Sequence, residues 1–170
     1  MPSGTYLGMT LSIADADQAN ATFFRYCREH ALHLQQCRDC RLLRYPPSAN
    51  CPFCGSASDD WVPVEGKGIV HTYTEVHHAT NPAFKPFAPY MVAIVELGVQ
   101  IDQPRPHVAL RIPGIVIARN GGVAERAVWE SIGIGSAMHM TFVDVSDEIA
   151  LPAWTLDETA GDRAVWRAQV

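Results

Sequence analysis

The amino-acid sequence predicts a mainly β protein with an N-terminal helix, a rubredoxin-like zinc ribbon and a small five-stranded OB-type β-barrel. Three observations support this prediction: two Cys-x-x-Cys pairs separated by ten residues, an amphipathic helical pattern before them, and a series of short β-branched runs after them. We expect an N-terminal helical segment over 1–31, the ribbon over 32–65, the barrel over 66–156 and a C-terminal tail over 157–170.

The composition is that of a globular protein. Of 170 residues, 48% are hydrophobic and 18% are charged, which is enough apolar material for a buried core. The first residues have neither the basic start nor the apolar stretch of a secretory signal, so we expect a cytoplasmic protein. A net charge of −5 argues against the broad cationic surface that non-specific nucleic-acid binding uses.

The N-terminal part predicts an amphipathic helix over 15–30. Apolar residues recur there at every fourth position, and they include Phe23 and Cys27. Asp15 or Asp17 is available as the N-cap. Cys27 lies outside the two cysteine pairs, and we interpret it as a small core residue without chemistry of its own.

The predicted metal site consists of Cys37, Cys40, Cys51 and Cys54. Two residues between cysteines let both sulfurs of a pair face one centre, and two such pairs complete a tetrahedral S4 site. Disulfides fit this spacing poorly in a chain expected in the cytoplasm. Four protein ligands leave no open position for water or substrate, so we predict a structural metal. Zinc is the default, and iron is an alternative that thiolate geometry alone does not exclude.

The remaining elements are predicted to be strands. Leu32 and Leu34 alternate with polar residues before the first cysteine pair, and strand character resumes at Trp61 and Val62 after the second. Gly66-Lys67-Gly68 is predicted to be a junction with a geometric role, because no helix follows it to bind a phosphate. The candidate barrel strands are 69–76, 89–97, 107–112, 114–118 and 137–145.

These residues resemble a known family, the acyl-CoA-associated zinc-ribbon and OB-fold proteins long catalogued as a domain of unknown function, number thirty-five. The shared pieces are Leu32-x-Leu34-x-Gln36-Cys37-x-x-Cys40, Pro46-Pro47, Cys51-Pro52-x-Cys54-Gly55, Trp61, Gly66-x-Gly68, Tyr73-Thr74, Pro89-Tyr90, Val95-Glu96-Leu97, Gly133 to Gly135 and Leu151-Pro152. The chain departs from the pattern in two places. Glu29-His30-Ala31 replaces an expected glycine-bearing turn, and 112–132 is an elongated insertion.

The resemblance implies a non-catalytic, zinc-containing accessory subunit. Such a subunit binds acyl-CoA through its OB portion and organises a thiolase-like or hot-dog-fold enoyl-CoA-hydratase partner, which carries the catalytic residues. The aromatic side chains available to stack a base or contact pantetheine are Tyr73, Phe84, Phe87 and Tyr90. The cations available for phosphates are Lys67, Lys85 and Arg119.

Other functions compete with this one. Seven histidines include His71, His77 and His78 near one predicted strand, but no serine or free cysteine has a nucleophile context. Five arginines between positions 25 and 44 lie either on solvated or partner-facing surfaces or against an anionic ligand. A nucleic-acid-binding zinc-ribbon and OB-fold protein is therefore the alternative function, and a small electron-transfer protein is a third.

Overall fold

The computed structural model describes the whole chain except residues 15–16, 102, 106–108, 162 and 169–170. Its strands form three antiparallel sheets, and the strand orders are β1-β2, β4-β3-β5 and β10-β9-β6-β7-β8. The elements are β1 (Ser3–Tyr6), β2 (Met9–Ser12), α1 (Gln18–Arg28), β3 (His33–Cys37), β4 (Leu43–Arg44), β5 (Asp59–Pro63), β6 (Lys67–Val76), η1 (Pro82–Phe87), β7 (Tyr90–Leu97), β8 (Arg111–Ile115), α2 (Arg126–Trp129), β9 (Ala137–Asp144) and β10 (Ala150–Leu156). No helix among the described residues is long and apolar enough to cross a membrane.

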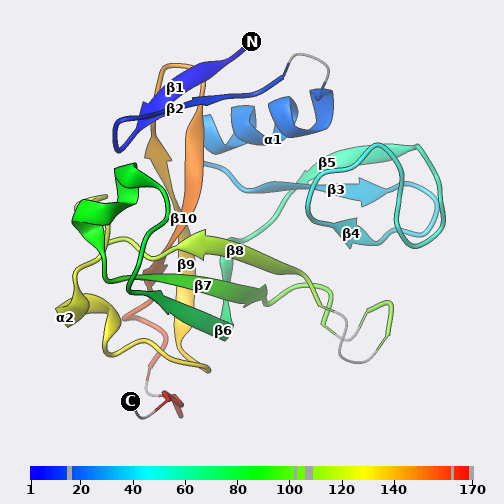
Figure 1. Cartoon of the computed structure of the whole chain (residues 1–170). Helices are drawn as coiled ribbons and strands as arrows, with labels where there is room; N and C mark the ends of the chain where they lie inside the picture. The colour runs from blue at the N-terminus through cyan, green and yellow to red at the C-terminus, as the bar shows by residue number, and fades with distance from the viewer. Residues whose placement is uncertain (15–16, 102, 106–108, 162, 169–170) are drawn as a thin grey trace.

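The five-stranded sheet curls into an OB-type barrel (Figure 1). Its two edge strands meet where Val116, just after β8, forms a parallel bridge with Trp154 of β10. The indole N–H of Trp154 also donates to the carbonyl of Ile112, at 3.1 Å. A side chain at Gly114 would lie 2.7 Å from the Trp154 ring, so glycine lets β8 pass close over the indole. The predicted fold class, mainly β with a ribbon and an OB-type barrel, is confirmed.

The strand prediction is wrong in two places, and in each of them the strand contains a proline. The separate candidates 107–112 and 114–118 are one strand, β8, in which Pro113 pairs with Ile94; residues 106–108 lie outside the described residues. The strand β10 was missed, and it contains Pro152. Both β8 and β10 are edge strands of the five-stranded sheet. Proline is tolerated in an edge strand, because its missing N–H removes no hydrogen bond between two central strands. The candidates 69–76, 89–97 and 137–145 correspond to β6, β7 and β9.

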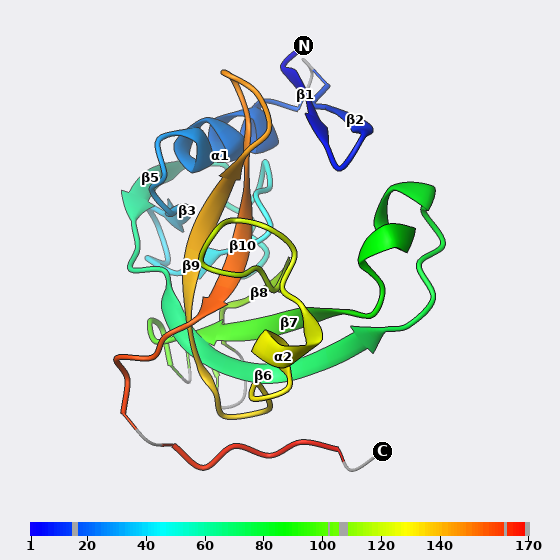
Figure 2. The ribbon, with the colours of Figure 1, turned by 90° about the vertical axis from the view of Figure 1, so that its left-hand side faces the viewer.

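The N-terminal segment contains more than the predicted helix. Helix α1 is present, Asp17 is its N-cap, and Phe23 and Cys27 are buried on its apolar face. Before it, β1 and β2 form a hairpin that the sequence interpretation missed. Its two-residue turn uses Leu7 and Gly8, both with positive φ, so the usual Asn-Gly signal is absent. Figure 2 shows α1 lying across one end of β9 and β10.

The expected glycine after α1 is replaced by a strained histidine. His30 has a φ of 55°, in the left-handed region that favours glycine. Contacts with the barrel compensate for the strain: His30 Nε2 lies 2.8 Å from a carboxylate oxygen of Asp144, and its ring stacks on Phe142 at 5.7 Å. Arg28 binds the same carboxylate at 3.2 Å. The end of α1 is thereby tied to β9.

Candidate metal centre and ligand surfaces

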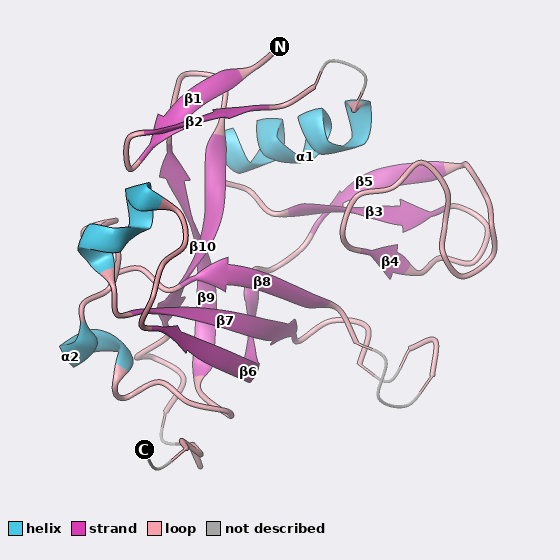
Figure 3. Cartoon of the chain, in the orientation of Figure 1, coloured by secondary structure: helices cyan, strands magenta, loops and turns pink. Residues whose placement is uncertain are grey.

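The four predicted cysteines come together in the ribbon, which Figure 3 shows beside the barrel and below α1. Cys37 is the last residue of β3 and Cys40 lies in the knuckle that follows, and the loop between β4 and β5 carries Cys51 and Cys54. The four sulfurs lie within 4.8 Å of one another. Cys37 and Cys54 are 3.5 Å apart and Cys40 and Cys51 are 3.6 Å apart, across the two knuckles.

This geometry fits a tetrahedral metal. Zinc–sulfur bonds of about 2.3 Å place the sulfurs of a tetrahedral site about 3.8 Å apart, close to the two separations across the knuckles. The cavity between the sulfurs therefore suits one zinc ion. All four ligand positions are taken by protein thiolates, so the chemistry supplied by the metal is structural.

Backbone N–H groups favour the thiolate form of one cysteine in each knuckle, Cys37 and Cys51. The amides of Cys40 and Asp39 donate to Cys37, and the amide of Cys40 is the largest of the effects that lower the pKa of Cys37 to about 6. In the second knuckle burial opposes ionisation of Cys51, but the amides of Phe53 and Cys54 donate to its sulfur and lower its pKa. The other cysteine of each pair has a raised pKa: the amide of Leu42 lowers that of Cys40, but burial and the neighbouring thiols raise it to about 12, and the amide of Ser56 lowers that of Cys54, but the thiol of Cys37 raises it. A thiolate is the form that binds zinc, so the knuckle backbone favours metal binding at Cys37 and Cys51.

A buried polar network supports the ribbon, and sequence interpretation missed it. Arg44 is only 2% exposed, and its guanidinium binds Asp59 at 2.6 Å and Gln35 at 3.1 Å. The side chain of Gln35 also accepts from the amide of Ser48, at 2.8 Å. For Arg44 both interpretations are wrong, because it lies neither on a solvated or partner-facing surface nor against an external anionic ligand. It binds a carboxylate of its own chain and holds the strands of the ribbon together.

Two other arginines of the same span also face carboxylates. Arg28 pairs with Asp144 at 3.2 Å, and Arg38 pairs with Asp60 at 2.5 Å. Together with Arg44, three of the five arginines in this span form ion pairs with carboxylates of this chain. The local excess of arginine therefore forms no uninterrupted anion-binding surface.

The structure brings part of the predicted aromatic set together. The ring of Phe84, in η1, lies 5.5 Å from Tyr90 and 6.0 Å from Tyr6, between centroids. Phe87, at the end of η1, keeps 38% of its surface exposed. Tyr73 is held elsewhere, because its hydroxyl accepts from the amide of Ala168 at 3.0 Å.

The predicted cations divide between two places. Lys67 and Arg119 line one cavity of about 310 Å³ although they lie far apart in the sequence. Each is paired with a carboxylate there, Lys67 with Glu65 at 2.9 Å and Arg119 with Glu158. Lys85 lies instead in η1 with the aromatic residues. Lys67 begins β6, whereas Tyr90 pairs with Val76 at the opposite end of that strand.

The histidines also depart from the predicted arrangement. His71 lies at a register shift in β6, and its Nδ1 is 3.8 Å from a carboxylate oxygen of Glu96. His77 and His78 follow β6 and are not in it, so an argument from alternating strand faces does not apply to them. Glu96 binds Arg111 at 3.0 Å.

Comparison with known proteins identifies both halves of the chain. Residues 24–60 match the domain described as "ChsH2, rubredoxin-like zinc ribbon domain", and residues 61–143 match "ChsH2, C-terminal OB-fold domain". A solved structure, the "Ltp2-ChsH2(DUF35) aldolase", is similar at a TM-score of 0.64 and 30% identity, covering 86% of this chain and 98% of that chain.

Two curated proteins match over shorter stretches. One is the "Probable enoyl-CoA hydratase alpha subunit" of Thermomonospora curvata, 44% identical over 78 residues, which are 46% of this chain and 24% of that protein. The other is a "DUF35 domain-containing scaffold protein" of Methanocaldococcus jannaschii, 36% identical over 74 residues, 43% of this chain and 49% of that protein. The matched stretches thus span half or less of these relatives. With the ribbon, its four-cysteine metal centre and the OB fold in place, the chain belongs to the DUF35 family of ChsH2-type zinc-ribbon and OB-fold proteins.

Proposed function

We propose that this chain is a non-catalytic accessory subunit that binds acyl-CoA and organises a thiolase-like or enoyl-CoA-hydratase partner. The main support is its likeness, over 98% of that chain, to the DUF35 chain of the Ltp2-ChsH2 aldolase, a protein named for two components. The relative named as an enoyl-CoA hydratase subunit points to the same class of chemistry. The metal centre fits an accessory role, because its four thiolates leave no position for a substrate.

The other chemically active groups also fit a non-catalytic role. Cys27 is fully buried, and burial raises the pKa of its thiol to about 12, so it is not a nucleophile near neutral pH. The carboxylates nearest His71 and His77 are already bound by arginines: Glu96 by Arg111 at 3.0 Å, and Glu75 by Arg167 at 2.6 Å. These groups form ion-pair networks on the barrel surface.

The purified chain is expected to show no thiolase, hydratase, aldolase or hydrolase activity. It has a closed metal site, and its histidine–carboxylate pairs are held by arginine. The measurement is turnover of a panel of acyl-CoA and enoyl-CoA substrates by the pure chain. Robust turnover that disappears on substitution of His71, His77 or His78 would contradict the accessory role.

Purification from the native host tests the partner. We expect a thiolase-like, hydratase or aldolase chain to co-elute with the tagged protein at a defined stoichiometry and to be identified by mass spectrometry. Recovery of the protein with bound nucleic acid instead, released by high salt, would favour the nucleic-acid-binding alternative.

Phe87→Ala is expected to weaken CoA binding more than Lys85→Ala does. Exposed ion pairs are each worth little, whereas stacking of one base contributes roughly 1–3 kcal/mol. Both residues lie in η1, and Phe87 is 38% exposed, so the pair is matched for position. Calorimetric titration of each variant with CoA, and with single-stranded DNA at moderate salt, decides the question. Tight, salt-sensitive DNA binding without a CoA signal would refute the proposed ligand.

A further inference from the structure

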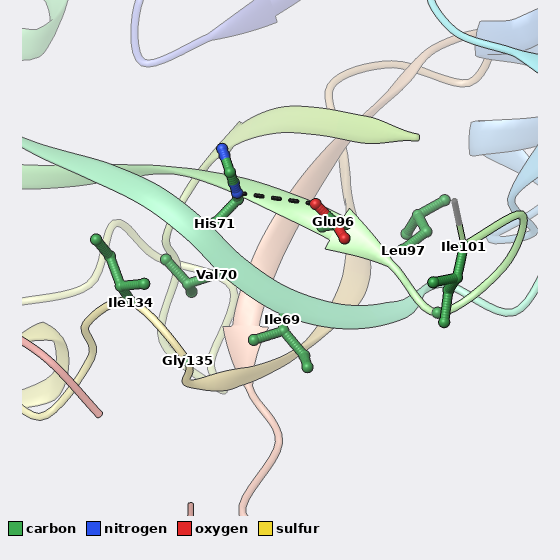
Figure 4. A pocket seen from close by; sticks show the side chains of 9 residues that line it. Ile69, Val70, His71, Glu96, Leu97, Ile101, Ile134 and Gly135 are labelled. Carbon is green, nitrogen blue, oxygen red and sulfur yellow. Dashed lines mark ion pairs between the residues drawn. The ribbon is translucent and has the colours of Figure 1, made fainter. Parts of the chain in front are cut away.

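An apolar cavity of about 250 Å³ opens on the outer face of the barrel, at the junction of β6, β7 and the loop before β9. Figure 4 shows its isoleucines on three separate segments: Ile69 on β6, Ile101 after β7 and Ile134 before β9. Val70 and Leu97 complete the apolar wall. None of the sequence patterns pointed to it, because its walls come from segments far apart along the chain.

The mouth of this cavity is unusually apolar for a surface. Ile69 is 39% exposed, Ile134 is 36% exposed and Ile101 is 61% exposed. Trp166, which is 60% exposed, extends the same surface. It exchanges two backbone hydrogen bonds of 2.9 Å with Ile134, and residues paired in this way carry their side chains on the same face. The exposed apolar area is on the order of 400 Å², within the range of the largest patch on a typical monomer, which is often a functional site.

The C-terminal segment is held firmly at this mouth. Arg167 donates to the carbonyl of Trp129 at 2.8 Å and binds Glu75 at 2.6 Å. A side chain at Gly133 would lie 2.3 Å from the carbonyl oxygen of Trp166, so glycine is needed for the close approach of the two backbones. The contacts of Arg167 and the close approach of Gly133 therefore position Trp166 beside Ile134.

Polar groups lie at one edge of the cavity only. His71 and Glu96 line that edge, with 3.8 Å between them (Figure 4). An apolar cavity with a polar edge matches a ligand that carries an apolar chain on a polar carrier.

The size of the cavity limits the length of the chain. A cavity of about 150 Å³ holds benzene, so by proportion 250 Å³ accommodates about ten carbons. Resting on the proposed acyl-CoA-binding function, the structure assigns this cavity to the acyl group, of medium length. Phe87 and Tyr90 lie near the other end of β6, about 23 Å away along seven residues, a separation that an extended acyl-CoA can span.

Chain-length dependence tests this assignment on the unaltered protein. The full chain is titrated with CoA and with butyryl-, hexanoyl-, octanoyl-, decanoyl- and dodecanoyl-CoA, and with octanoate alone. Affinity is expected to rise about fourfold for each added methylene and to level off near ten carbons. Octanoate is expected to bind more weakly than octanoyl-CoA, because it lacks the carrier; equal binding would assign the site to free fatty acids.

A matched pair of variants tests the location. Ile134→Asp introduces a charge into the cavity wall and is expected to reduce octanoyl-CoA affinity to that of CoA. Val128→Asp is the control, because Val128 is similarly exposed, at 38%, but lies on α2 outside this cavity. Circular dichroism establishes that each variant is folded, and the chain-length series remains decisive if Ile134→Asp is not.

Four results would overturn the assignment. CoA and octanoyl-CoA binding equally well to the unaltered protein would refute the acyl cavity but leave the proposed CoA binding intact. Equal losses in the two variants would place the ligand elsewhere, and an Ile134→Asp defect confined to partner association would make the surface a protein contact. Absence of binding by every CoA compound would refute the ligand half of the proposed function as well.

Discussion

Replacing Cys37 by serine is expected to empty the metal centre and unfold the segment from β3 to β5 while the barrel stays folded. Serine removes one of the four thiolates, and the ribbon has few buried apolar residues of its own. Structural zinc contributes apparent folding free energies of about 10–16 kcal/mol in zinc-finger peptides near pH 7. Zinc content should fall from one equivalent, and proteolysis should cut within 32–64 while the barrel resists.

Cys27→Ala is the control for this experiment. Cys27 is equally buried but lies outside the metal set, so this variant is expected to lose some stability and to retain its zinc. Protein purified without chelator should be colourless, since an iron S4 site absorbs visible light and zinc does not. Much less than one equivalent of metal in the unaltered protein, or a ribbon that stays folded in Cys37→Ser, would contradict a structural metal.

Trp154→Ala is expected to lower the free energy of unfolding of the barrel by about 3–5 kcal/mol. The indole is fully buried where the edge strands β8 and β10 meet, packs against Gly114 and donates to the carbonyl of Ile112. Alanine would leave a large cavity at this seam and an unpaired carbonyl. For a chain of this size the loss corresponds to a fall in Tm of about 6–20 °C, which thermal unfolding followed by circular dichroism measures.

Trp154→Phe separates the packing from the hydrogen bond. Phenylalanine fills much of the indole volume but cannot donate to Ile112, so a smaller loss of about 1–2 kcal/mol is expected. Trp129→Phe is a useful comparison, because that indole is also fully buried but its N–H has no hydrogen-bond partner among the described residues. If alanine and phenylalanine at position 154 lowered the free energy of unfolding equally, the volume of the side chain at the seam would be shown to be unimportant.

The metal centre could be predicted almost completely from the sequence. Cys-x-x-Cys spacing is a local property, and a knuckle of a few residues determines where its sulfurs and amides point. Helix α1 was equally predictable, because its N-cap, Asp17, is a local signal and its buried residues Phe23 and Cys27 are four residues apart, which is helical spacing. Strands β6, β7 and β9 were found because their β-branched runs are not interrupted by proline.

Whether the two segments that contain proline form strands depended on the strands beside them. Pro113 and Pro152 look like breaks in the sequence, but each lies in an edge strand where a missing N–H is tolerated. His30, at φ 55°, is strained locally and is held by tertiary contacts with Asp144 and Phe142. Local propensity alone predicts none of these, because the compensating groups lie far away in the chain.

Short spacings along the chain were therefore enough to predict the metal ligands, the order of helix, ribbon and barrel, and the family resemblance. The tertiary structure decided which side chains share a surface: it separated Tyr73 from Phe84 and Tyr90, buried Arg44 against Asp59, and assembled a cavity from Ile69, Leu97 and Ile134. Strand pairing and the docking of the C-terminal segment bring these residues together. Such long-range pairings depend on the packing of the whole chain and leave no periodic signal in the sequence.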